Sequence, residues 1–548
     1  MSFLSVLLAL LPFISSALGS NFIRQTGDLH IVNTRISPDG YERSAVVAGK
    51  SPHEATFPGP TIIGYRGDTF RINVTNSLTD PSMDLTTSIH WHGIHQRHSN
   101  WADGATWVTQ CPIVPNESFV YEFTVPDQAG TYWYHSHHRA QFCDGLRGIL
   151  VVYDRPGEDP LRELYDVDDE STIITIADWY HDPSPGLIEL AGPKLSNSTL
   201  INGLGRWSEN PSSSVSVVNV VYGKRYRFRL VSISCDRAYT FSIDEHPLTI
   251  IEADGNPTAP HTVNTLMVYT AQRYSFVLHA NKGTKGKLSS YWIRANPNDG
   301  PVGFEGGINS AVLKYVAEDR NSSKLESDET KEPTSTNVTN IQPGSVGLQE
   351  SDLHYLASSS QVPGESYTGG ADFVLNLTLG FIPPNTFLIN GHPMVFPTTP
   401  TLLQILSGAR DPHELMPKEN IYVLPKGKVI EVNMFGNDTI GGPHPMHLHG
   451  HSFDVIKSED HSEFNFWNPV RRDVVAVGGT NMTSIRFVTD NSGPWLLHCH
   501  NQFHLIRGLG AVFVVDSAGT EAINPVPVDW NELCPIWNTT SPSVRGDA

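Results

Sequence analysis

The sequence predicts an all-β protein built from several sandwich or barrel domains, and three observations lead to this prediction. The chain has 548 residues, which is long enough for several domains. It contains 45 glycines and 39 prolines, and long helical periodicities are scarce. Short alternating runs recur between turn signals, as in RYRFRLV at 225–231 and SYWIRA at 290–295. Many short strands separated by turn residues are typical of sandwiches and barrels.

Internal repetition predicts how these domains follow one another. HWHGIH at 90–95 and HLHGHSF at 447–453 are similar, and each precedes a second histidine pair by forty to fifty residues, in TYWYHSH and PWLLHCH. Between them, FSIDEHPLTIIEADG at 241–255 resembles the same pattern with its paired histidines lost. We therefore expect three copies of one β-sandwich module, at 21–155, 156–316 and 371–548, with metal chemistry in the first and third only.

Two segments lie outside these modules. Residues 1–20, MSFLSVLLALLPFISSALGS, form an apolar run that ends in small residues and resembles a secretory signal peptide. The stretch 317–370 is polar, acidic and rich in Ser and Thr, so we expect a surface linker there. No later stretch approaches the roughly 20 apolar residues of a membrane span. With nine Asn-x-Ser/Thr sequons, these features predict a secreted, extracellular glycoprotein.

The net charge of the chain limits the kinds of partner that it can bind. The formal net charge is −20, which argues against a nucleic-acid partner because such proteins present basic patches. Most of these charges serve solubility, although an acidic surface also suits the attraction of cations.

The segment WLLHCH at 495–500 carries the most information in the chain. Because side chains alternate between the faces of a strand, His498 and His500 point one way and Cys499 the other. One short strand can therefore offer imidazoles to one metal site and a thiolate to a second. A trigonal set of two histidines and a cysteine with a weak axial position is diagnostic of blue copper.

Three further segments carry histidines two residues apart: HWHG at 90–93, YHSH at 134–137 and HPMHLHGH at 444–451. A single such pair is more often a surface or core feature than a metal site, but four pairs with a cysteine inside one of them favour copper. The predicted ligands are His90, His92, His135, His137, His444, His447, His449, His498, Cys499, His500 and His504.

These four segments resemble the copper-binding signatures of the multicopper oxidases. The surrounding chain is similar to the laccases of basidiomycete fungi, as in NWADG at 100–104, ADWYH at 177–181, TLINGLGR at 199–206 and SCDRAYTFSID at 234–244. The resemblance implies three consecutive cupredoxin-like domains and four copper ions. It also implies oxidation of phenols or aromatic amines, reduction of O2 to water, and a monomeric enzyme. The physiological substrate stays open among lignin phenols, pigment precursors, plant phenolics and iron.

The resemblance also implies a role for each ligand. The type 1 copper, which accepts electrons from substrate, is expected on His444, Cys499 and His504, with the non-coordinating Leu509 at its axial position. A leucine there raises the potential relative to a methionine. The type 2 copper is expected on His90 and His447, and the two type 3 coppers on His92, His135 and His500 and on His137, His449 and His498.

Two carboxylates match further family positions. Asp103, in NWADG, corresponds to an aspartate that assists proton delivery to dioxygen, a reaction that consumes protons. Asp236, in SCD, corresponds to the residue that accepts a hydrogen bond from the phenol or amine, while the electron leaves toward His504. For an isolated aspartate a structural role comes first, but the flanking matches favour function for both.

The five cysteines leave four once Cys499 is assigned to copper, and four cysteines can pair in three ways. The resemblance selects Cys111–Cys534 and Cys143–Cys235, each joining the first domain to a later one.

The chain departs from the usual laccase near the type 1 site. Asn501, Gln502 and Phe503 replace Ile-Asp-Trp, and Leu505 begins a changed run after His504. This leaves two alternatives. One is a ferroxidase, or a mixed ferroxidase–laccase, that oxidises Fe(II); Asp178 then lies where such enzymes carry a glutamate. The other is a copper carrier without turnover, which the full ligand set disfavours.

Overall fold

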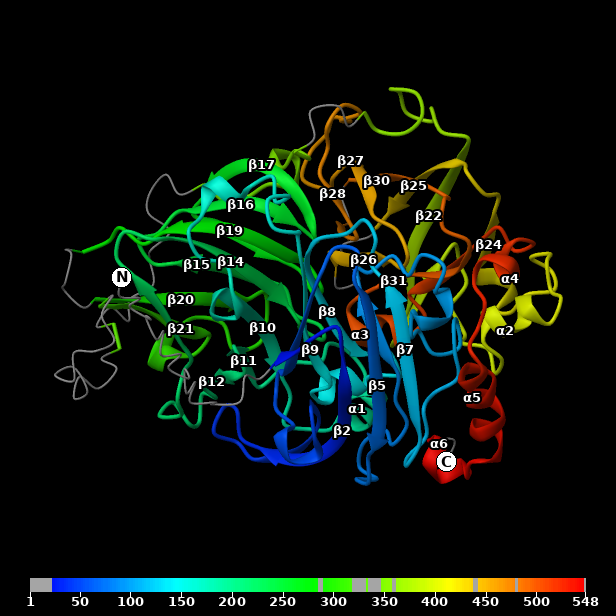
Figure 1. Cartoon of the computed structure of the whole chain (residues 1–548), viewed down its shortest axis with the longest axis horizontal. Helices are drawn as coiled ribbons and strands as arrows, with labels where there is room; N and C mark the ends of the chain where they lie inside the picture. The colour runs from blue at the N-terminus through cyan, green and yellow to red at the C-terminus, as the bar shows by residue number, and fades with distance from the viewer. Residues whose placement is uncertain are drawn as a thin grey trace, which may run out of the picture.

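The computed structural model describes residues 22–283, 289–317, 332–333, 346–356, 361–436, 442–478 and 481–546. These residues form six β-sheets and only short helices, so the all-β prediction is confirmed (Figure 1). The predicted signal peptide at 1–20 lies outside the described residues. The sheets fall into three pairs along the chain.

The first pair of sheets spans 22–153. Buried and exposed side chains alternate along its strands. In β5, Phe70, Ile72 and Val74 are buried while Arg71 faces outward. One sheet has the order β1 (Phe22–Ile23), β4 (Gly59–Tyr65), β9 (Arg147–Tyr153), β8 (Gly130–Ser136) and β6 (Ile89–His92). The other has the order β3 (Arg43–Gly49), β2 (Thr26–Ile36), β5 (Thr69–Ser77) and β7 (Ser118–Thr124).

The second pair spans 173–316. One sheet has the order β12 (Leu204–Gly205), β11 (Ser198–Ile201), β10 (Ile173–Trp179), β14 (Arg225–Ser232), β19 (Arg273–His279), β16 (Leu248–Ala253) and β17 (Asn256–Val263). The other has the order β13 (Val217–Val221), β21 (Ser310–Val316), β20 (Ser290–Pro297), β15 (Tyr239–Ile243) and β18 (Thr265–Val268).

The third pair spans 373–515. One sheet has the order β23 (Thr386–Ile389), β22 (Phe373–Ile382), β25 (Val429–Phe435), β30 (Thr483–Val488), β27 (Phe453–Lys457) and β28 (Arg471–Arg472). The other has the order β24 (Ile421–Leu424), β32 (Gly510–Val515), β31 (Gly493–Cys499), β26 (His444–Leu448) and β29 (Val474–Val477).

The helices are short, and α5 runs beside β7 near the C-terminus (Figure 1). In the described part of the chain, no helix has the length and apolar character needed to span a bilayer. The helices are α1 (Ser184–Glu189), α2 (Thr401–Leu406), α3 (Gln502–Ile506), α4 (Thr520–Ile523), α5 (Val528–Thr539) and α6 (Pro542–Arg545).

Two disulfides fasten distant parts of the chain to the first pair of sheets. Cys111 bonds to Cys534 in α5, and Cys143 bonds to Cys235, just after β14. These are the pairings that the family resemblance implies, and Cys499 is a buried free cysteine. The second disulfide fixes the chain immediately before Asp236.

Part of the predicted linker is packed rather than exposed. Of the stretch 317–370, residues 318–331, 334–345 and 357–360 lie outside the described residues. Glu350 begins a 3-10 turn, Glu350–Asp352, and its carboxylate accepts hydrogen bonds from buried Arg472 at 2.7–2.8 Å. Leu353 is buried in the core shared by the second and third pairs of sheets. Glu350 and Leu353 thus anchor this segment, and Glu350 shares Arg472 with Asp254.

Candidate metal centres and substrate cavity

Two antiparallel strand pairs position the eight histidines expected at the cluster. In the first sheet pair, β6 lies against β8 so that His90 faces His135 across the ladder. In the third, β26 lies against β31 so that His447 faces His498. Each ladder places two His-x-His pairs side by side, since alternate residues share a face. We refer to His90, His92, His135, His137, His447, His449, His498 and His500 as the histidine cluster.

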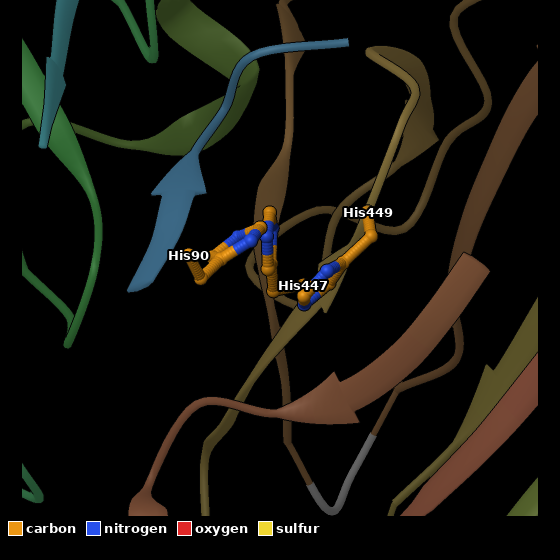
Figure 2. Close-up of side chains that lie close together, drawn as sticks. All are labelled: His90, His447 and His449. Carbon is orange, nitrogen blue, oxygen red and sulfur yellow. The ribbon is translucent and has the colours of Figure 1, made fainter. Parts of the chain in front are cut away.

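The imidazoles from the two ladders interleave. His90 stacks on His449 with ring centroids 4.0 Å apart, and His92 stacks on His447 at 3.8 Å. Figure 2 shows His90 reaching from its own strand toward His447 and His449. The cluster therefore forms between the first and third sheet pairs, as the internal repeat predicts.

The ring nitrogens of the cluster have the pattern expected of metal ligands. The Nδ1 atoms of His90, His135 and His498 lie 2.7, 2.8 and 2.9 Å from backbone carbonyl oxygens. An Nδ1–H that donates to a carbonyl leaves a lone pair on Nε2. The buried Nε2 atoms of His90, His135, His137, His447 and His500 have no hydrogen-bond partner among the described residues.

Unpaired buried nitrogens are costly, and a metal ion satisfies them. Burial also lowers the pKa of these imidazoles, so they stay neutral and able to coordinate. The lowered pKa values belong to His92, His135, His137, His447, His449, His498 and His500.

The distances between the imidazoles agree with some of the expected ligand groupings. Donor atoms of His137, His449 and His498 lie within 4.8 Å of one another, which is one expected type 3 set. Those of His90 and His447 also lie within this distance, together with His449. The third set has ring centroids 4.9 Å apart for His92–His500, 5.2 Å for His135–His500 and 5.9 Å for His92–His135. The division of imidazoles among individual coppers stays a prediction.

Asp103 contacts the cluster directly. It follows the 3-10 turn Asn100–Ala102, is fully buried, and its Oδ2 lies 2.8 Å from Nδ1 of His449. Its backbone carbonyl accepts from Nδ1 of His90 at 2.7 Å. The Oδ1 atom has no hydrogen-bond partner among the described residues. Asp103 therefore orients two imidazoles and keeps one oxygen available for a proton.

Asp473 is a second acid at the cluster, and sequence reasoning missed it. Its carboxylate lies 3.1 Å from Nε2 of His92 and 3.5 Å from Nδ1 of His447. It also accepts two hydrogen bonds, at 2.7 and 2.6 Å, from Arg273, the first residue of β19. Although burial opposes it, the Arg273 guanidinium holds the pKa of Asp473 well below its ordinary value. The middle sheet pair thus contributes to the cluster through Arg273, although we expected metal chemistry in the first and third modules only.

The expected type 1 ligands lie together at the opposite face of β31. Nδ1 of His444 and Nδ1 of His504 are 3.2 Å apart, and the Cys499 sulfur lies 3.7 and 3.6 Å from them. His444 begins β26, Cys499 ends β31, and His504 lies in α3. Leu509 is fully buried, and its backbone carbonyl accepts from the N–H of Cys499. A leucine side chain offers no donor atom to a metal.

A cavity of about 380 Å³ opens beside His504. Its walls come from the segments around α1, β14, β23 and α3, and we call it the His504 cavity. Asp236 lines it, and burial raises the pKa of Asp236 to about 6. The Oδ1 atom of Asp236 is buried without a hydrogen-bond partner among the described residues. The cavity has the size of a small-molecule site and an acceptor for an O–H or N–H donor.

Asp178 holds the cavity wall in place. It is fully buried in β10, forms an ion pair with Arg147, and accepts the backbone N–H groups of Cys235 and Asp236 at 2.7 and 2.8 Å. Asp178 is not among the residues that line the His504 cavity. Its carboxylate is thus committed to protein groups, unlike the iron-binding acid that the ferroxidase alternative places there.

Comparison with known proteins identifies relatives that match nearly the whole chain. Multicopper oxidase family models match residues 31–157, 170–318 and 395–519. A laccase of Phlebia radiata is 49% identical, covering 94% of both chains. Among solved structures, a laccase of Botrytis aclada has a TM-score of 0.77 at 30% identity, covering 95% of this chain and 93% of its own. Fet3p, a multicopper oxidase that functions in iron import, has a TM-score of 0.78 at 26% identity, covering 94% and 96%.

Proposed function

This chain belongs to the multicopper oxidase family as a copper-dependent, laccase-type oxidoreductase, and we propose that it holds four coppers and couples one-electron oxidation of phenols or aromatic amines to reduction of O2 to water. The observation that carries this proposal is the arrangement around Cys499. Its sulfur lies beside His504, whose ring borders the His504 cavity, and its backbone neighbours are His498 and His500.

The proposed ligands follow the expected sets. His444, Cys499 and His504 would hold the type 1 copper, and the buried Leu509, whose carbonyl accepts from the Cys499 N–H, would not coordinate it. The histidine cluster would hold the other three: His90 and His447 the type 2 copper, and the remaining six the type 3 pair. The buried, unpaired Nε2 atoms support this assignment. When bound, copper supplies one-electron acceptance from the organic substrate and one-electron donation to O2.

The chain's own residues would bind substrate and move protons. Asp236 would accept the phenolic or amine proton in the His504 cavity, since its Oδ1 has no other partner among the described residues. His504 would contact the substrate ring at the cavity edge, where Phe387 packs on its imidazole with ring centroids 4.3 Å apart. Asp103 would deliver protons beside His449, as general acid catalysis requires a group within hydrogen-bond reach.

Several structural expectations belong to this proposal. Residues 21–155, 156–316 and 371–548 would form three cupredoxin-like domains, and the three successive pairs of sheets support that division. We also propose that the enzyme is secreted, glycosylated and monomeric, as the apolar start of the sequence and its sequons suggest.

Iron oxidation is the weaker alternative, although Fet3p is a structural relative. The carboxylate of Asp178 is buried against Arg147 and backbone N–H groups, so it is not available to Fe(II). Cationic side chains also line the His504 cavity, and these repel a divalent cation.

Oxygen uptake by the copper-loaded protein tests the proposed function. One sample receives 2,6-dimethoxyphenol and a matched sample receives Fe(II). We expect efficient turnover of the phenol and weak turnover of iron. Iron turnover equal to the phenol would move the function to iron oxidation. Uptake with neither substrate, at full copper occupancy, would support the copper-carrier alternative.

A further inference from the structure

Three cationic side chains, Lys194, Arg237 and Arg507, line the His504 cavity together with the carboxylates of Asp236 and Asp299. The three cations come from separate segments: the loop before β11, the segment after β14, and the end of α3. Their convergence is unusual for a protein with a formal net charge of −20. It creates a local field opposite in sign to that of the whole molecule.

Only one of these cations is neutralised by a carboxylate. Arg237 forms an ion pair with Asp299 and also donates to the backbone carbonyl of Lys194 at 2.5 Å. Among the described residues, neither Lys194 nor Arg507 forms an ion pair with a carboxylate. Asp236 is the remaining acid of the cavity, and its role with the substrate hydroxyl is already argued. Two uncompensated cations therefore face the same space.

Lys194 and Arg507 are held in place by backbone carbonyls. Nζ of Lys194 donates to the carbonyls of Leu190 and Gly192 at 2.5 and 2.6 Å. An Nη atom of Arg507 donates to the carbonyl of Ile188. These contacts fix the two heads but leave further N–H donors on each, because an ammonium has three and a guanidinium five.

Lys194 and Arg507 are anchored to the same short stretch of chain at the end of α1, because the carbonyls that they contact belong to Ile188, Leu190 and Gly192. Burial and the neighbouring Arg507 lower the pKa of Lys194, whereas Asp236 opposes that shift. Lys194 is 7% exposed and Arg507 is half-buried. Two like charges held together at a cavity wall are stabilised by an anion between them. A carboxylate group suits this position, because it accepts charge-assisted hydrogen bonds from both Lys and Arg.

We propose that the His504 cavity selects phenols that carry an acidic substituent, with the phenolic hydroxyl on Asp236 and the substituent's carboxylate between Lys194 and Arg507. This inference rests on the proposed phenol oxidation and adds the substrate class. The acidic group takes no part in the chemistry. The O–H bond still breaks at the other end of the ring, where Asp236 receives the proton and the electron leaves at His504.

A matched pair of substrates tests this selection. The probes are 4-hydroxy-3,5-dimethoxybenzoate and its neutral methyl ester, which share the same phenol. The quantity measured is the ratio of kcat/KM for the acid to kcat/KM for the ester, compared between the wild type and each variant. Because both proteins meet the same two substrates, differences in intrinsic reactivity cancel. If neither substrate were oxidised by the wild type, the proposed function itself would fail.

The variants are Lys194→Gln, Arg507→Gln and the charge-conserving Arg507→Lys. We expect each glutamine variant to lower the acid-to-ester ratio about tenfold, as loss of a charge-assisted hydrogen bond implies. Arg507→Lys should keep more than half of the wild-type ratio, which separates charge from disruption of the wall. Two exposed cations outside the cavity lining provide controls, Lys428→Gln and Arg35→Gln, with ratios within about twofold of wild type.

Salt dependence gives a second readout without mutation. If the local cations attract the carboxylate, added salt lowers the wild-type acid-to-ester ratio by screening that attraction. A ratio that rises with salt would mean that the net charge of −20 governs the encounter, and the proposal would be wrong. An unchanged ratio in both glutamine variants would overturn it as well.

Discussion

The histidine cluster and the His504 cavity are neighbouring regions with opposite designs. Each of the eight imidazoles of the cluster is at most 4% exposed, and their charged neighbours Asp103 and Asp473 each contact a ring nitrogen. The cavity is open, and it holds an unpartnered carboxylate oxygen and two cations without an acidic partner among the described residues. The cluster is thus arranged to hold fixed groups, while the cavity keeps polar groups available for a molecule that enters and leaves.

The histidine cluster and the His504 cavity also differ in the parts of the chain that build them. The cluster is built by two strand ladders with equivalent registers, one in the first sheet pair and one in the third. The cavity is built by loops, strand ends and the short helices α1 and α3. The predicted ligands of the cluster therefore lie on strands or at their ends, whereas the proposed substrate contacts lie on connecting segments.

Cys499→Ser should have the largest effect because it breaks the connection between the two regions. Serine keeps the size of the side chain but removes the thiolate that a type 1 copper needs. We expect loss of phenol oxidation and of the intense blue absorption, with the copper of the histidine cluster retained. Copper content, the visible spectrum and oxygen uptake measure these outcomes. Retained phenol turnover in this variant would show that electrons do not pass through Cys499.

Asp103→Asn changes the cluster without touching the cavity. The amide cannot deliver a proton, so we expect turnover to fall about 100-fold or more, as for loss of a general acid. Reduction of the type 1 copper by phenol, followed by stopped-flow absorbance, should stay near the wild-type rate. The exposed Asp127→Asn, in the Arg97 ion pair, is the matched control. Equal losses in turnover and in type 1 reduction would place Asp103 outside proton delivery.

Asp473→Asn tests the contribution of the middle sheet pair to the cluster. Removing the charge frees the Arg273 guanidinium and loosens His92 and His447. We expect about a 10- to 100-fold loss in copper affinity of the cluster, the usual cost of removing a group that orients a ligand. Competition with a copper chelator measures it. Unchanged copper affinity would mean that Asp473 only links the second and third sheet pairs through Arg273.

The low pKa of Asp473 also gives a pH dependence of stability. Its folded-state pKa lies below the unfolded value, so the stabilisation is present above the unfolded pKa and is lost as the pH falls through the folded one. The asparagine variant should lose the most stability, relative to wild type, near neutral pH. Thermal unfolding across a pH series tests this order.

Asp236→Asn should have the smallest of these effects, and it acts only in the cavity. We expect kcat/KM for phenols to fall about tenfold, because a charged hydrogen-bond acceptor is replaced by a neutral one. Since burial raises the pKa of Asp236 to about 6, the carboxylate form predominates above that pH. The wild-type preference for phenols over a non-phenolic reductant should therefore rise as the pH passes through about 6. An asparagine variant that keeps this inflection would assign it to another group.

The histidine cluster was easier to predict from the sequence than the His504 cavity. The ligand residues were predictable because each His-x-His pair lies in a strand or at its carboxyl end, where alternation brings the rings to one face. Asp473 was not predictable, because its role depends on Arg273, which lies 200 positions away. The convergence of Lys194 and Arg507 was hidden for the same reason. The segment around Glu350 reads as a linker by composition, yet its carboxylate pairs with Arg472 in the interior.

The most direct test of the central claim is the ratio of reductant oxidised to O2 consumed by the copper-loaded enzyme, measured with ferrocyanide because it loses one electron and is not oxidised further. If the type 1 site and the histidine cluster act as one catalyst, about four ferrocyanide ions are oxidised for every O2, and no peroxide accumulates. A ratio of about two, with peroxide as the product, would contradict the account, because it would mean that the histidine cluster does not complete the reduction of oxygen to water.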